Sequence, residues 1–125
     1  MAEANRITIA RVAHGRGPID VEFLGRQTLG DAGLEQEVLR LFDVMSHTYM
    51  SRLEDSTSRE ALLQHLHTMK GAAGGVGAFG LADLARDMEA KLAAGGVVDP
   101  EQIEDIRLAV EEVSAFISQR ISSAA

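Results

Sequence analysis

Four stretches of the chain repeat apolar residues at gaps of three and four, and this periodicity restricts the fold more than any other feature of the sequence. Such gaps place side chains on one face of an α-helix, so each stretch is predicted to be an amphipathic helix. The first two apolar stripes are Leu34, Val38, Leu41, Phe42, Met45, Tyr49 and Leu53, and then Leu62, Leu66, Met69, Ala73 and Val76. The other two are Leu81, Leu84, Ala85, Met88 and Leu92, and then Ile103, Ile106, Val110, Val113, Phe116, Ile117 and Ile121.

Signals for helix ends separate these stripes. Residues that can cap a helix N-terminus stand at Asp20, Asp31, Ser58 and Asp99, and glycines that can end a helix stand at Gly30, Gly95 and Gly96. The segment between the first cap and the first glycine predicts a short extra helix. The expected fold is therefore all-α, an antiparallel four-helix bundle with a short additional N-terminal helix.

A length of 125 residues suits one domain. Residues 1–17 show no sustained periodicity and are predicted to be a mobile N-terminal arm, with a short strand at ITIARV as the alternative. Residues 18–125 are predicted to form the helical domain.

Composition excludes several classes of function. The chain has no cysteine, which excludes disulfides and thiolate metal sites. Its formal net charge of −7 disfavours binding to nucleic acid or to anionic membranes. It has no apolar run of membrane-spanning length and no apolar signal core near its start. We therefore expect a soluble, cytoplasmic protein, monomeric, with no nucleic-acid or membrane partner.

The segment HLHTMKGAAGGVGA, residues 65–78, places four glycines at the end of the second stripe. Glycine inside a helix costs about 1 kcal/mol relative to alanine, so the cluster requires an explanation. The apolar stripe continues through the glycines to Val76, which predicts that the helix does not stop at Gly71.

The same helical phase separates the two histidines of this segment. With Leu62 at the centre of the core face and about 100° per residue, His67 falls about 140° away and His65 about 60° away. His67 is therefore predicted to face solvent, with Gly71 one turn further on and Lys70 three residues on. An open imidazole is a neutral nucleophile at pH 7, and a nearby cation would suit an added phosphoryl group.

The segment HTMKGAAGGVGA resembles the signature of histidine-containing phosphotransfer (Hpt) domains, which act in multistep phosphorelays. The matching positions are His67, Lys70, Gly71, Ala72, Ala73, Gly77 and Ala78. The upstream segment DVEFLGRQTLGD and the following LRLF are also similar to the entry segment of that family. The resemblance extends over about residues 18–122.

The resemblance implies that His67 accepts a phosphoryl group from the aspartate of one receiver domain and passes it to the aspartate of another. The expected partners are receiver domains of a hybrid histidine kinase or a response regulator. No cofactor is expected in this chain, because Mg²⁺ and the acidic pocket belong to the receiver. The chain is expected to be a relay intermediate and not a kinase, which agrees with its lack of a Gly-rich nucleotide loop.

Three further residues have expected roles beside His67. Lys70 would stabilise the added phosphate, and Gly71 would leave the ring accessible. Glu89, on the third predicted long helix, is where many members of the family place a polar side chain facing the histidine, and it could orient the imidazole. An exposed Glu89 paired with Arg86 or Lys91 is an equally good interpretation.

Other functions are considered beside the relay. A bundle of this kind could be a docking module that binds receivers without transferring phosphate, although such a module would be expected to lack the histidine. The phosphoacceptor domain of a kinase typically has an acidic residue after its histidine, whereas Thr68 follows His67. A metal-binding bundle would need inward-facing Glu-x-x-His motifs, and the sequence has none. His14, His47 and His65 are predicted to be surface or boundary residues.

Overall fold

The computed structural model describes residues 17–124, which are helical throughout except for turns, and this range contains no β-strand. The helices are α2 (Val21–Gln27), α3 (Ala32–Asp55), α4 (Arg59–Val76), α5 (Phe79–Ala93) and α6 (Pro100–Ala124). The all-α prediction is confirmed for this range, including the short leading helix. Apart from Gly17, the predicted N-terminal arm lies outside the described residues.

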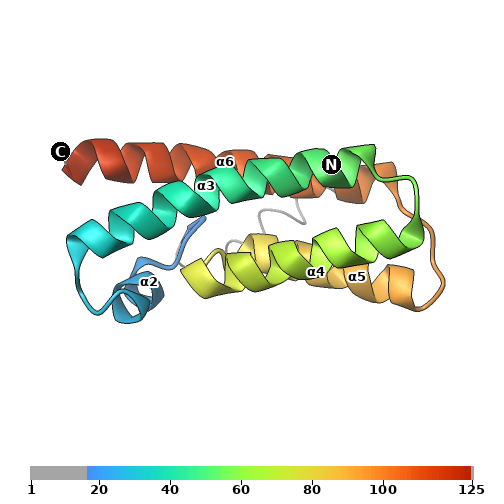
Figure 1. Cartoon of the computed structure of the whole chain (residues 1–125), viewed down its shortest axis with the longest axis horizontal. Coiled ribbons are helices and arrows are strands. Elements are labelled where there is room, and N and C mark those ends of the chain that lie inside the picture. The colour runs from blue at the N-terminus through green and yellow to red at the C-terminus, as the bar shows by residue number, and fades with distance from the viewer. Residues whose placement is uncertain (1–16, 125) are drawn as a thin grey trace.

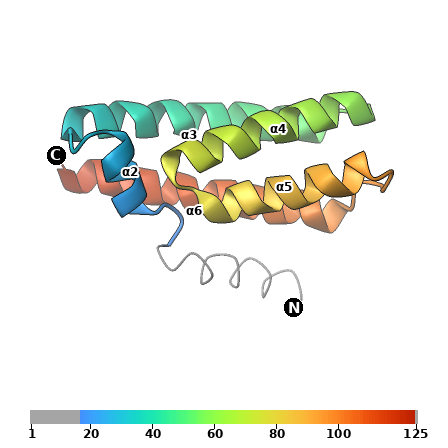
Figure 2. The same cartoon turned by 90° about the horizontal axis from the view of Figure 1, so that it is seen from below.

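The four long helices lie side by side along the long axis of the molecule (Figure 1). Each packs against two neighbours: α3 against α4 and α6, and α5 against α4 and α6. The short α2 sits at one end and contacts α4 (Figure 2). This arrangement encloses a single apolar core.

The predicted caps are where the helices begin. The side chains of Asp20, Asp31 and Ser58 each accept a hydrogen bond from the backbone N–H three residues further on, at 3.1, 3.0 and 3.2 Å. Such bonds satisfy amide groups that the first turn of a helix leaves unpaired. Helix α6 begins at Pro100, directly after Asp99, as predicted.

The predicted core stripes of α4, α5 and α6 are confirmed. All five stripe residues of α4 are buried, and Leu66 at their centre is completely buried. The stripe residues of α5 and α6 are buried or packed half-buried against the core. The helical phase that places His67 on the outside therefore holds.

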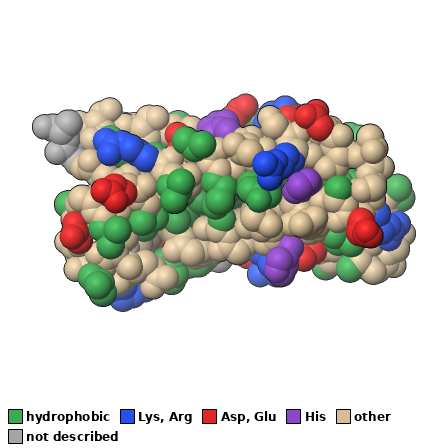
Figure 3. All heavy atoms as spheres, viewed as in Figure 1, with side chains coloured by type: hydrophobic (Ala, Val, Ile, Leu, Met, Phe, Trp, Pro, Cys, Tyr) green, Lys and Arg blue, Asp and Glu red, His purple; other side chains and the backbone are tan. Residues whose placement is uncertain are grey.

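The stripe predicted for α3 is partly wrong. Leu41 and Leu34 are 70% and 40% exposed, and the buried positions include Leu39 and Met50 instead. Helix α3 carries apolar side chains on more than one face, so two helical phases fit its sequence. Phe42 and Leu53 of the predicted stripe are buried, and Val38, Met45 and Tyr49 pack partly buried against the core. Packing against α4 and α6 turns the buried face away from Leu41, which leaves hydrophobic side chains on the outer surface (Figure 3).

The glycine cluster divides into two kinds of position. Helix α4 continues through Gly71 to Val76, as predicted, and a Cβ atom at Gly71 or Gly74 would meet nothing within 4 Å. Gly77 differs, because it ends the helix with φ of +87° and its Cβ would lie 2.9 Å from the carbonyl oxygen of Asp20. The Asp20 amide also donates to the Gly77 carbonyl at 2.9 Å. Only Gly77 is therefore required by the backbone.

A pair of leucine substitutions tests which faces of α4 and α3 are buried. Leu66→Ala should lower the free energy of unfolding by about 2 to 5 kcal/mol, because it leaves a cavity in the centre of the core. The matched change Leu41→Ala, at an exposed position, should alter it by less than about 0.5 kcal/mol. Urea denaturation of both variants measures the difference, and equal effects would contradict the described packing.

Candidate functional site

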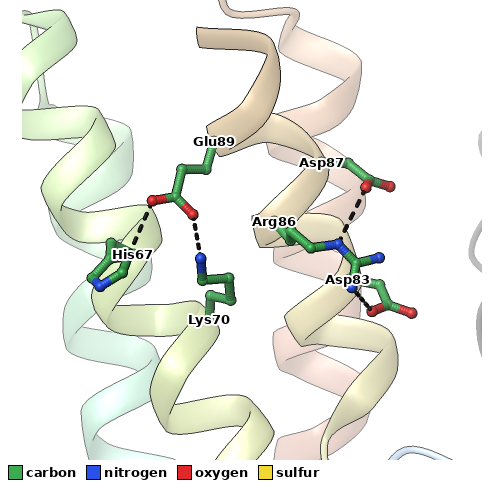
Figure 4. A network of polar contacts seen from close by, with 6 residues as sticks. All are labelled: His67, Lys70, Asp83, Arg86, Asp87 and Glu89. Carbon is green, nitrogen blue, oxygen red and sulfur yellow. Dashed lines mark hydrogen bonds and ion pairs between the residues drawn. The ribbon is translucent and has the colours of Figure 1, made fainter. Parts of the chain in front are cut away.

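His67 stands on the outer face of α4, with its side chain 70% exposed. Its Nδ1 atom lies 3.1 Å from Oε2 of Glu89, which projects from the neighbouring helix α5 (Figure 4). The opposite edge of the ring, which carries Nε2, faces away from this contact. The histidine is thus held at one nitrogen by a side chain of a different helix.

Glu89 also contacts Lys70. Its second oxygen, Oε1, accepts a hydrogen bond from Lys70 Nζ at 2.7 Å. His67 and Lys70 lie three residues apart on α4, so their side chains share one face of the helix. A single carboxylate on α5 therefore bridges both side chains (Figure 4).

The electrostatics of the site follow from this bridge. The pKa of Glu89 is lowered, chiefly by the hydrogen bond from Lys70 and further by that from His67, while partial desolvation opposes the shift. Glu89 is consequently ionised at pH 7. An ionised carboxylate can only accept hydrogen bonds, so the contact with His67 requires the proton on Nδ1 and leaves the lone pair on Nε2.

Gly71 provides open space beside this ring. It follows His67 by four residues, one helical turn, and it is exposed. A Cβ atom there would meet nothing within 4 Å. The outer face of α4 one turn after His67 is therefore bare backbone that leaves room for an incoming group.

In a comparison with protein families, the Hpt domain family model matches residues 34–116. The chain belongs to the Hpt domain family. The matched region includes His67, Lys70, Gly71 and Glu89. Hpt domains are phosphotransfer modules of two-component phosphorelays, work with receiver domains and have no kinase activity of their own. A comparison with curated proteins and a comparison with solved structures each gave no match.

The four site residues predicted for this Hpt domain lie close together, and the contacts of Arg86 and Lys91 bear on the alternative pairing of Glu89 with those two cations. Arg86 pairs with Asp83 at 3.0 Å and lies 3.8 Å from Asp87, on another side of α5 (Figure 4). Lys91 donates to Gln102 of α6 at 3.0 Å. Glu89 thus contacts His67 and not these two cations.

The ion pair between Lys70 and Glu89 was not predicted from the sequence. The sequence analysis assigned Lys70 only to an added phosphate. The pairing depends on how far α5 runs back along α4 after the turn at Gly77. The sequence signal for this ion pair is the number of residues that separate Lys70 and Glu89 from Gly77.

Two other histidines lie within the described part of the Hpt domain. His65 is half-buried, and its ring packs edge-on against Tyr49 of α3 with centroids 5.7 Å apart. His47 is exposed on α3, and its ring nitrogen contacts the backbone of Asp43. His14 lies outside the described residues. His65 is therefore the boundary residue that the sequence predicted.

Neither a metal-binding cluster nor a membrane-spanning helix occurs among the residues that the structure describes. Within residues 17–124, no group of three or more His, Asp or Glu side chains is placed to hold a metal ion. None of the helices described there is both long enough and apolar enough to cross a membrane.

The shifted titration of Glu89 is directly measurable. The carboxylate resonance of Glu89, followed by NMR from pH 7 to pH 2, should titrate below the ordinary value of 4.5. Because the folded-state pKa is the lower one, the pairing stabilises the fold above the ordinary value, and this contribution is lost as pH falls through the folded-state pKa. Lys70→Ala removes the largest cause and should raise the titration midpoint. An unchanged midpoint in that variant would contradict the bridge.

Proposed function

We propose that this Hpt domain is a phosphorelay intermediate in which His67 carries the phosphoryl group. The observation that supports this most directly is the held and exposed imidazole, with Nδ1 in contact with Glu89 and the side chain 70% exposed. His65 has neither a lysine three residues on nor a glycine four residues on. It is also half-buried against Tyr49.

The proposed transfer uses the lone pair of Nε2. This nitrogen attacks the phosphorus of an aspartyl phosphate on a receiver domain, a P–N bond forms, and the P–O bond to the aspartate breaks as its carboxylate leaves. The proton on Nδ1 stays in place, hydrogen-bonded to Glu89. The same steps in reverse pass the phosphoryl group to the aspartate of a second receiver. Mg²⁺ and the acidic pocket come with the receiver, so this chain needs no cofactor.

The other site residues have supporting roles in the proposal. Lys70 approaches the added phosphate, Gly71 keeps the approach to Nε2 open, and Glu89 orients the ring. The contribution of Lys70 is modest, because charge interactions near solvent are screened.

The proposal also covers the fold, the oligomeric state, the location and the partners of the protein. Residues 18–125 form an antiparallel four-helix bundle with a leading helix, which acts as a monomer in the cytoplasm. Its partners are the receiver domains of a hybrid histidine kinase, of a response regulator, or of both.

Labelling by a phosphorylated receiver tests the acceptor. We expect the label on His67, in an acid-labile and base-stable linkage, as a phosphoramidate is. His67→Gln should abolish labelling, whereas the matched change His65→Gln should largely preserve it. Lys70→Ala should slow transfer without eliminating it. Receivers of the source organism supply the donors, and the readout is the phosphorylated fraction over time.

One result would end this assignment of function. If the His67→Gln protein were labelled as fully as the wild type, His67 would not be the acceptor. If that variant and the wild type both bound receivers but neither was labelled, the docking-module function would replace the relay.

The open turn beside the ring gives a separate prediction. Gly71→Gln should leave the fold intact, since its Cβ meets nothing within 4 Å and glycine is the poorer helix former. Transfer from the receiver should nonetheless fall, because the new side chain crowds the ring and the incoming domain. The initial rate of labelling and a thermal melt separate the two effects. Wild-type transfer by Gly71→Gln would show that access does not depend on this glycine.

A further inference from the structure

Glu89 holds Lys70 more closely than it holds His67. The Lys70 Nζ contact is 2.7 Å and the His67 Nδ1 contact is 3.1 Å. The Glu89 side chain is 21% exposed and that of Lys70 is 32% exposed, so the ion pair is partly shielded from water. In the resting site the positive charge of Lys70 is therefore already matched by a carboxylate.

Phosphorylation of His67 would change this match between the charges of Lys70 and Glu89. A phosphoryl group on His67 brings close to two negative charges into a site where one cation already has an anionic partner. The other cation that Figure 4 draws, Arg86, is paired with Asp83 and Asp87 on a different side of α5. While Lys70 stays paired with Glu89, its positive charge is shared between the carboxylate and the phosphate, so the phosphate is stabilised less.

We propose that Glu89 competes with the phosphoryl group for Lys70, and that this competition makes phosphorylated His67 a readier phosphate donor. The inference rests on the proposed function and adds a second role for Glu89, as a residue that sets the transfer equilibrium by acting through Lys70. The imidazole contact positions the ring for accepting phosphate. The contact between Glu89 and Lys70 disfavours retention of the phosphoryl group on His67.

The bonds of the transfer itself are unchanged by this role. The P–N bond of phosphorylated His67 breaks, the electron pair returns to Nε2, and the receiver aspartate takes the phosphoryl group. As the phosphate leaves, Lys70 regains Glu89. Recovering the full ion pair thus favours the donating direction, and forming the phosphohistidine weakens that pair.

The test compares equilibrium phosphate distribution in wild type and Glu89→Gln. Each protein is loaded with potassium phosphoramidate and mixed with a Mg²⁺-saturated receiver domain that labels the wild type. The phosphorylated fractions are then measured at equilibrium. Gln keeps the length of the side chain and can still accept from Nδ1. The variant should retain phosphate about fivefold more strongly than wild type, the ratio that a partly exposed ion pair of about 1 kcal/mol produces.

A matched control removes the same charge elsewhere on α5. Asp87→Asn takes away a carboxylate two residues from Glu89, at a side chain 67% exposed that contacts Arg86. It should leave the distribution within about twofold of wild type, because it makes no contact with Lys70. A shift as large as that of Glu89→Gln would overturn the inference.

The second arm tests whether Glu89 acts through Lys70. The Glu89→Gln change is repeated in Lys70→Ala protein, where no lysine is left to compete for, and its effect should shrink to less than about twofold. An equal effect in both backgrounds would mean simple repulsion of the phosphate and would refute competition. Failure of the proposed function looks different, since wild-type His67 would then take no phosphate from the receiver at all.

Discussion

The turn between α4 and α5 is the constraint on which the site depends. Gly77 adopts φ of +87°, and the amide of Ala78 returns to the carbonyl of Ala73 at 2.8 Å. His67 lies ten residues before Gly77 and Glu89 lies twelve after it, distances of about 15 and 18 Å along two helices. The two side chains therefore meet at the same height. A different turn would move Glu89 along α5 and away from the histidine.

The same turn is joined to the start of the domain. The amide of Asp20 donates to the Gly77 carbonyl, while the Asp20 side chain caps α2. Phe23 of α2 packs edge-on against Phe79, the first residue of α5, with ring centroids 5.0 Å apart. The leading helix is small, but it covers the corner that sets the register between α4 and α5. Helix α2 therefore helps to fix the position of Glu89 relative to His67, although both residues lie several helical turns away from it.

The sequence predicted α4 well and α3 less well, for a physical reason. Helix α4 has glycines, a lysine and a polar histidine opposite its apolar stripe, so only one helical phase buries hydrophobic side chains. Helix α3 has apolar residues such as Leu41 and Val44 on its outer surface, and its periodicity alone does not identify the buried face. Packing against α4 and α6 makes that choice. Likewise, the choice of Glu89 between His67, Arg86 and Lys91 depends on the relative position of two helices, which local sequence does not encode.

The glycines of α4 near His67 affect which amino-acid substitutions the protein can accept. Gly71, Gly74 and Gly75 sit in a regular helix where a side chain would meet no neighbour, so alanine at any of them is sterically permitted and favoured by helix propensity. Substitutions of this kind commonly raise stability. At Gly71, however, each added atom would occupy space beside the imidazole through which, in the proposed relay, a receiver approaches His67. Alanine at Gly74 or Gly75 could therefore raise the stability of α4 without covering His67, whereas the same gain at Gly71 would reduce the space beside the imidazole.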